Sequence, residues 1–171
     1  MSHSIMYHEG NRRLQDQFSS RPVSDRLEER MTHTAFNDDD RTFLESAQYF
    51  FIATADAEGR PDCSFRGGPP GFVRVTGPSE LAFPDYDGNG MFKSLGNILD
   101  DPLLAETVGA QLIVRVRARA IFPNCPRYIP NMQLISPSRY IPRPGCDPIE
   151  PVWKSFDDFK DVVHPRQKTA R

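Results

Sequence analysis

The sequence is poor in the residues that build metal centres and disulfide frameworks. It contains three cysteines and four histidines among 171 residues. Cys63, Cys125 and Cys146 lie far apart and lack the CxxC spacing of a structural zinc site or a redox pair. The histidines lie in or near the terminal segments. We therefore expect free thiols and no metal site.

Long apolar runs are also absent. No uninterrupted apolar segment approaches the roughly 20 residues that span a bilayer, and the opening MSHSIMYHEGNRRL lacks the apolar centre of a signal peptide. The formal net charge of −2 gives no electrostatic reason for nucleic acid to be the principal partner. We expect a cytoplasmic protein that binds neither membrane nor nucleic acid, so any anion site must be local.

Three common motifs are missing as well. The sequence contains no GxGxxG, no GxxxxGKS or GxxxxGKT, and no GxSxG. A dinucleotide-binding fold, a P-loop and a serine hydrolase therefore have no motif support. What is present is an ordinary soluble composition, with 38% hydrophobic and 26% charged residues. The length fits one domain with appended segments.

Residues 1–47 are polar and favour helices. The pattern predicts an N-cap at Ser24, and the acidic run from Asp38 to Asp40 suits the start of a further helix. We predict an N-terminal extension of short helices that cover the core of the protein, with solvated charges on their outer faces.

From residue 48 to residue 130 the pattern is mainly that of strands. Apolar, β-favouring segments are separated by turn signals such as DAEG and GPSE. The predicted strands cover residues 49–55, 60–65, 72–76, 81–83 and 111–122. Apolar spacing over residues 91–99 predicts one short helix, with Asn89 as its cap.

Proline is concentrated near the end of the chain. Eight of the 16 prolines lie between Pro123 and Pro151, which favours extended structure over a second packed domain. We predict that residues 131–171 form a proline-rich C-terminal wrap and tail, with one last helix over residues 155–163.

The stretch CSFRGGPPGF, residues 63–72, places one arginine beside two glycines directly after a strand. Glycine lets a phosphate approach the main chain closely, and a guanidinium can bind two phosphate oxygens at once. Arg66 is therefore a candidate anion-binding residue. The alternative is that Gly67, Gly68 and the prolines only build a bend, with Arg66 in solvent.

A second candidate anion site lies in GNGMFKS, residues 88–94. The first N–H groups of a helix have no partners within the helix, so this segment can present main-chain donors together with Lys93 and Ser94. The alternative is that Asn89 is a plain cap and that Lys93 points to water.

FPNCPRYI, residues 122–129, places Cys125 near Arg127. A nearby cation activates a thiol as a nucleophile, but no histidine is close in sequence. The alternative is a structural cysteine, with Arg127 the functional residue of the pair. Tyr86 and Cys125 are candidate acid–base groups, yet neither has a sequence neighbour that would tune it.

Three blocks, FFIATADAEGRPDCSFRGGPPGFVRV, LAFPDYDGNGMFKSLGN and FPNCPRYI, occur in this order along the chain. Together they closely resemble the pyridoxamine 5′-phosphate oxidase-like family of FMN-binding split barrels. Within that family they are most similar to a branch described as probable flavin-nucleotide-binding proteins. The resemblance extends from about Tyr7 to Trp153.

The resemblance implies a mainly β protein with short helices, in which a split antiparallel β-barrel forms a homodimer and holds FMN at the subunit interface. Residues 48–130 would be the FMN-binding core. By matching positions, the FMN-binding residues would lie after the second strand, on the short helix and in the third block. They are Ser64, Arg66, Gly67, Asn89, Met91, Ser94, Asn97 and Arg127.

The chain departs from the family pattern after Asn97. Relatives continue with a further strand pair of the form GLLFIDF and LRVNG. Residues 98–110 are too few here for two strands and a turn beside the remaining loop. Either that pair is deleted, or the sequence omits a segment that the protein contains. A true deletion would expose sheet edges and weaken the flavin slot.

Two functions from different classes follow from the resemblance. The first is an FMN-binding oxidoreductase with a small-molecule electron donor or acceptor, in which the flavin carries the electrons and the protein holds its phosphate. The second is a non-catalytic dimeric module that binds a flavin or a related ligand. A deazaflavin or a haem is a further alternative on the same fold.

Overall fold

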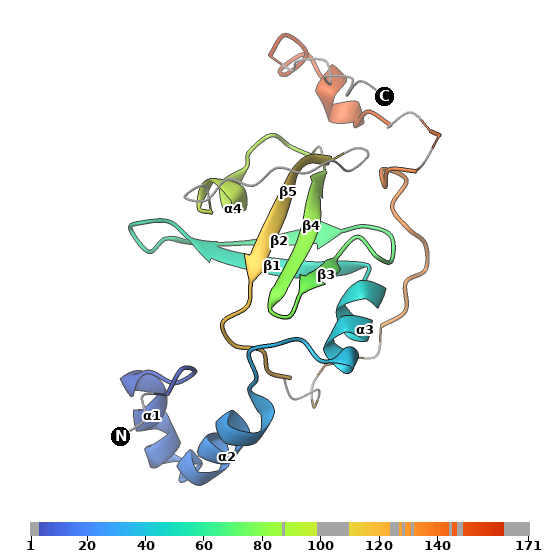
Figure 1. The fold of residues 1–171 in the computed structure, drawn as a ribbon. Helices are drawn as coiled ribbons and strands as arrows, with labels where there is room; N and C mark the ends of the chain where they lie inside the picture. The colour runs from blue at the N-terminus through green and yellow to red at the C-terminus, as the bar shows by residue number, and fades with distance from the viewer. Residues whose placement is uncertain are drawn as a thin grey trace. The chain divides into compact units, whose positions relative to one another are not determined.

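The computed structural model describes residues 4–86, 88–98, 110–123, 127, 129–130, 132–143, 145–146 and 149–162. The chain divides into two compact units, Met1–Gln133 and Leu134–Arg171. In chain order the elements (Figure 1) are α1 (Glu9–Gln17), α2 (Arg21–Met31), α3 (Asp38–Ser46), β1 (Tyr49–Ala55), β2 (Pro61–Gly67), β3 (Arg74–Gly77), β4 (Glu80–Tyr86), α4 (Lys93–Gly96), β5 (Ala110–Arg117) and the 3-10 helix η1 (Val152–Ser155).

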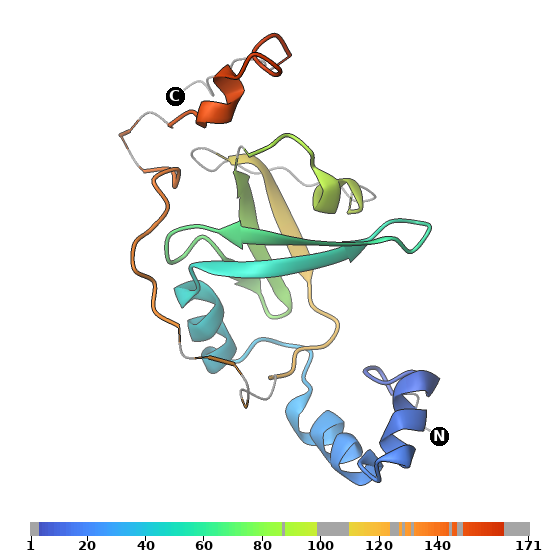
Figure 2. The same cartoon turned by 180° about the vertical axis from the view of Figure 1, so that it is seen from behind.

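Two antiparallel sheets form the centre of the first unit. β1 and β2 form a hairpin, and β3, β4 and β5 form a three-stranded sheet in that order. The hairpin runs across the strands of the second sheet (Figures 1 and 2). Strands were predicted in all five places, although β5 ends at Arg117 rather than at Phe122. Beyond β5, Ile121 makes an isolated bridge to His33.

The core of the first unit lies between these two sheets. Phe50 of β1 packs edge to face on Phe83 of β4, with ring centroids 4.8 Å apart, and Phe72 stacks on Phe50 at 5.8 Å. The Phe83 side chain is almost completely buried, with 2% exposed. The aromatic contact between the sheets holds β1 against β4, and β2 is held through its pairing with β1. β2 and β4 carry the polar residues described below.

α3 begins at the predicted acidic run, and its cap explains why. The Asn37 side chain accepts a hydrogen bond from Asp40 N–H, and the Asp40 side chain accepts one from Asn37 N–H. This reciprocal capping box satisfies two donors of the first turn. α3 then packs on β3, where Arg41 donates to the Val75 carbonyl at 3.1 Å.

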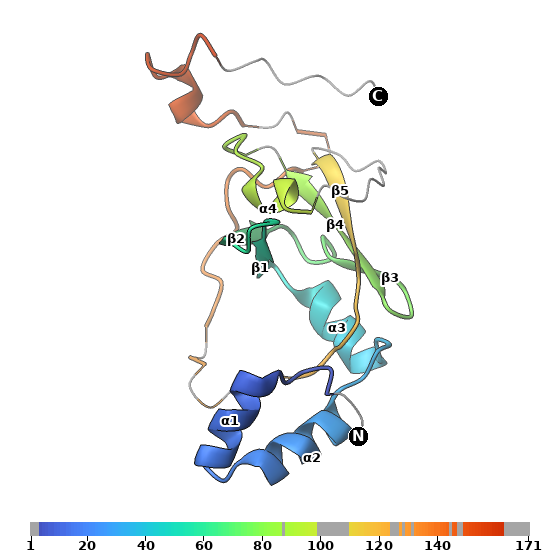
Figure 3. The same cartoon turned by 90° about the vertical axis from the view of Figure 1, so that its left-hand side faces the viewer.

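The predicted N-cap at Ser24 is wrong. α2 begins at Arg21 after Ser20, and Pro22 lies in the first turn, where its missing N–H costs no hydrogen bond. Ser24 therefore lies inside the helix, and its hydroxyl donates to the Ser20 carbonyl at 3.1 Å. α1 and α2 pack against each other (Figure 3), joined by an ion pair between Arg12 and Asp25 at 2.6 Å.

Two helices differ from their predicted form. α4 is a single turn rather than a helix over residues 91–99. Its N-cap residue is Phe92, in the left-handed region at φ 48°, whereas Asn89 accepts a hydrogen bond from Met91 N–H. The helix predicted over residues 155–163 is also wrong. η1 ends at Ser155, and turns follow it to residue 162, because this short uncapped segment has too few residues to propagate an isolated helix.

Within the described part of the chain, no helix is both long and apolar enough to cross a membrane. No three His, Cys, Asp or Glu side chains among those residues gather as a metal site would require. Cys63 and Cys146 are free and exposed. Cys125 and residues 99–109 lie outside the described residues, so the predicted loss of a strand pair after Asn97 also falls outside them.

Candidate functional site

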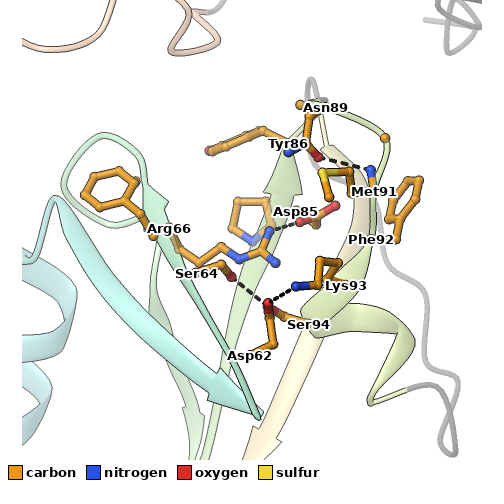
Figure 4. Close-up of a pocket in the computed structure, with 15 residues that line it drawn as sticks. Asp62, Ser64, Arg66, Asp85, Tyr86, Asn89, Met91, Phe92, Lys93 and Ser94 are labelled. Atoms are coloured by element: carbon orange, nitrogen blue, oxygen red, sulfur yellow. Dashed lines mark hydrogen bonds and ion pairs between the residues drawn. The ribbon is translucent and has the colours of Figure 1, made fainter. Parts of the chain in front are cut away.

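A pocket of about 400 Å³ lies between β2, the end of β4 and the segment 88–94 that leads into α4. Figure 4 shows the polar side chains that gather there. The pocket brings together six of the eight residues predicted to bind FMN. These are Ser64, Arg66, Gly67, Asn89, Met91 and Ser94.

β2 supplies one wall of the pocket through its alternation. Successive side chains of a strand point to opposite faces, so Asp62, Ser64 and Arg66 share the inner face. Cys63 and Phe65, between them, are exposed on the outer face. The strand thus presents a row of three polar side chains at positions where a core strand would have apolar ones.

Arg66 forms an ion pair with Asp85 that links the two sheets, because Arg66 is on β2 and Asp85 is on β4 (Figure 4). The Asp85 side chain is 5% exposed and that of Arg66 is 19% exposed. The Arg66 Nε atom is buried and has no hydrogen-bond partner among the described residues. A guanidinium has five N–H donors, and among the described residues only Nη1 of Arg66 is paired, so Arg66 retains donors for an additional acceptor.

A second cluster surrounds Asp62, and we call it the Asp62 network. Lys93 Nζ lies 3.0 Å from Asp62 Oδ1, and Ser94 Oγ donates to Asp62 Oδ2 at 2.5 Å. Ser64 Oγ lies 2.7 Å from Ser94 Oγ. The hydrogen bond from Ser94, and then the one from Lys93, lower the pKa of Asp62 below its usual value. Asp62 is therefore ionised at neutral pH.

Tyr86 lines the pocket at the end of β4. Burial raises the pKa of its phenol above the ordinary value, and the charge of Arg74 opposes this shift only in part. Tyr86 is therefore neutral at neutral pH, when Asp62 carries a negative charge.

The glycines after Arg66 have a packing role. A Cβ atom on Gly68 would lie 2.5 Å from Phe72 Cγ, and Phe72 is part of the core. Gly71 adopts a φ of +83°, which a side chain would strain. The bend alternative thus describes Gly68, but Arg66 is not in solvent as that alternative required.

Two of the predicted residues lie elsewhere. Asn97 Nδ2 donates to Thr54 Oγ1 at 3.0 Å, which ties the end of α4 to β1. Neither Asn97 nor Arg127 is among the residues that line the pocket. The ligand-binding roles of both residues remain predictions from the resemblance.

Sequence reasoning missed both carboxylates of the pocket. Asp62 has the same strand parity as Ser64 and Arg66, so the period-two spacing was a signal that could have identified it. Asp85 offered no such signal, because it directly follows Phe83 and Pro84, and these three residues are the buried ones of β4.

Whether the pocket suits a phosphate group depends on its hydrogen-bond donors and on its charge. Arg66, Lys93 and the hydroxyls of Ser64 and Ser94 are donors of the kind that bind phosphate. Each cation, however, already faces a carboxylate of the pocket. The residues therefore fit a phosphate by donor type, and a phosphate would add negative charge to a balanced site.

The family model described as pyridoxamine 5′-phosphate oxidase matches residues 36–122, more than half of the chain, and this range contains both sheets and the whole pocket. Comparisons with curated proteins and with solved structures gave no significant match. From the extent of the family match, the chain belongs to the pyridoxamine 5′-phosphate oxidase family.

Proposed function

We propose that this protein is an FMN-binding oxidoreductase that acts as a cytoplasmic homodimer, with residues 48–130 as its flavin-binding core. The observation that carries the proposal is Arg66, which lies in the pocket with a buried Nε atom that has no hydrogen-bond partner among the described residues. Membership of the family supports the flavin as the ligand. Bound FMN would supply electron transfer to or from a small molecule.

In this proposal the residues of the chain bind and orient the cofactor. Arg66 binds the phosphate through its charge, and Ser64 and Ser94 contribute hydroxyl donors from β2 and α4. Asn89 and Met91 lie on the loop before α4, which forms the other wall of the pocket. The main chain at Gly67 allows close approach at the end of β2.

The outer face of the β1–β2 hairpin favours contact with a second subunit, and the unpaired edges of the hairpin favour further strands beside it, as a barrel would have. Tyr49, Phe51 and Phe65 form an exposed aromatic cluster there, and Phe51 is 66% exposed. Among the described residues, β1 and β2 pair only with each other. A partner subunit on this face would bury the aromatic rings and cover the sheet edges.

The first test is the substitution Arg66→Ala. A charge-assisted hydrogen bond is worth about 1.5 to 3 kcal/mol, so we expect FMN to bind roughly ten- to a hundredfold more weakly. Titration of flavin fluorescence against purified protein measures this directly. Arg60→Ala is the matched control, because it removes the same charge from the exposed turn of the same hairpin. Equal FMN affinities for Arg66→Ala and the wild type would contradict the proposal.

One observation favours a second candidate, a dimeric flavin-binding module without catalysis. Apart from Tyr86, the ionisable side chains that line the pocket are held in two ion pairs, Arg66 with Asp85 and Lys93 with Asp62, which leaves few groups available for proton transfer. The two candidates differ in redox behaviour. If NAD(P)H bleaches the bound flavin and oxygen restores its colour, the oxidoreductase is supported. A flavin that remains oxidised with small-molecule reductants supports the module.

A further inference from the structure

Three of the side chains that could donate to a phosphate already have partners within the protein. The Ser94 hydroxyl has one hydrogen, which it donates to Asp62 Oδ2. The contact between Ser64 Oγ and Ser94 Oγ must therefore be a hydrogen bond that Ser64 donates. Lys93 Nζ also binds Asp62. Two hydroxyls and one ammonium are thus engaged, directly or through Ser94, by a single carboxylate.

Asp62 also adds an unfavourable charge to any anion bound there. Its side chain is 12% exposed and lines the pocket. A phosphate that accepted hydrogen bonds from Lys93 and Ser94 would lie beside this carboxylate. Two neighbouring negative charges repel each other, and the repulsion is strong where water is partly excluded.

We propose that Asp62 is an internal competitor for the anion site, and that a phosphate ligand binds by displacing it from Lys93 and Ser94. The inference rests on the proposed function, because it concerns the same pocket. Arg66 is also paired with a carboxylate, Asp85, but that pair uses Nη1, and among the described residues its Nε atom has no hydrogen-bond partner. The dianionic phosphate would first meet Arg66 and then take the donors of the Asp62 network.

Asp62 consequently determines which ligands bind. A ligand must carry enough negative charge to replace a carboxylate at Lys93, so a phosphate monoester should bind and its neutral parent alcohol should not gain from these donors. For flavins this separates FMN from riboflavin, which has the same ring system and no phosphate. Asp62 is thus a specificity-determining residue of the pocket.

The test compares Asp62→Asn with the wild type. Asparagine keeps the size of the side chain and an acceptor for Ser94, but removes the charge. We expect FMN to bind Asp62→Asn roughly tenfold more tightly, and riboflavin to bind with unchanged affinity, as measured by flavin fluorescence titration. Glu58→Gln is the matched control, because it removes one negative charge from the exposed hairpin turn. It should leave both affinities unchanged.

An Asp62→Asn protein that binds FMN no more tightly than the wild type would overturn the inference. An equal gain for riboflavin would also overturn it, because the gain would not depend on phosphate. Asp62→Ala is a second variant and should tighten FMN binding too. If neither variant folds, as judged by circular dichroism, Asp62 is a structural residue and the inference is wrong.

The failure of the inference can be distinguished from the failure of the proposed function. If the wild type binds FMN and the Asp62 variants bind it equally well, only the inference fails. If the wild type does not bind FMN, the proposed function fails, and inorganic phosphate becomes the probe. A larger thermal stabilisation of Asp62→Asn than of the wild type by phosphate would then support the inference, and an equal stabilisation would overturn it.

Discussion

At the scale of single residues, the pocket is defined by opposed charges. Arg66 and Lys93 each face a carboxylate, and these two carboxylates come from different sheets, Asp62 from β2 and Asp85 from β4. An ion pair that is largely buried needs both partners, because removing one leaves an uncompensated charge. The ion pairs therefore hold the charged side chains of the pocket in place without a ligand.

Tyr86 provides a prediction about pH. Burial raises the pKa of its phenol above the ordinary value of 10.0. The unfolded chain therefore loses this proton first as the pH rises, so the free energy of unfolding should fall as the pH passes 10. In a near-ultraviolet absorbance titration, the wild type should show one tyrosine ionisation that Tyr86→Phe lacks. The pH midpoint of this ionisation should lie above that of an exposed tyrosine. If the ionisation that Tyr86→Phe lacks has its midpoint at or below the ordinary pKa of tyrosine, the prediction is wrong.

The sequence identified some residues of the pocket because their chemistry is visible without the fold. Arg66 beside two glycines and Ser94 after a glycine-rich loop both suggest phosphate binding in isolation. Asp85 could be identified only from the fold, because its role depends on Arg66, which lies 19 residues away in sequence. The bend alternative for Gly68 could be decided only from the fold, because its close neighbour is the core residue Phe72.

At the scale of elements, the stability of the first turn of a helix depends on its N-cap residue. The N-caps of α2 and α3 differ. Asn37 makes a reciprocal capping box at α3, whereas Ser20 at α2 makes no side-chain capping bond. A side-chain cap contributes about 0.5 to 2 kcal/mol. The acidic run at the start of α3 adds to this through the helix dipole.

We therefore expect Asn37→Ala to lower the free energy of unfolding by about 0.5 to 2 kcal/mol. Ser20→Ala, at the corresponding position of α2, should change it by less. Urea denaturation followed by circular dichroism measures both changes. The cap argument is wrong if Ser20→Ala is the more destabilising of the two.

Strands were predicted more successfully than short helices in this chain. The strands have an alternation of apolar and polar residues that the local sequence reveals. Pairing with a neighbouring strand then determines where each strand ends, as at β5. α4 and η1 are each four residues long, so their form depends on contacts and turn geometry rather than on periodicity. The left-handed Phe92 before α4 is such a local detail, which apolar spacing does not reveal.

At the scale of the whole molecule, the chain consists of two units joined at residues 133 and 134. Ile135, just after this junction, is 97% exposed. The described residues from 132 to 140 have no regular secondary structure and are all exposed. Such segments are preferred sites of proteolytic cleavage, because few contacts must break for the chain to enter a protease.

We expect limited proteolysis with thermolysin, which cleaves before large apolar residues, to cut first at Leu134 or Ile135. The fragment that ends at this point would retain both sheets and the pocket. Intact mass spectrometry of the early products identifies the site. A first cut within residues 36–122, the range matched by the family model, would contradict the division into units.

The two faces of β2 have a practical consequence. Cys63 lies on the outer, exposed face, while Asp62 and Ser64 beside it point into the pocket. A thiol reagent would thus report on burial of the hairpin's aromatic side, and flavin fluorescence would report on the opposite side. One strand thereby carries a reporter of burial on one face and ligand contacts on the other.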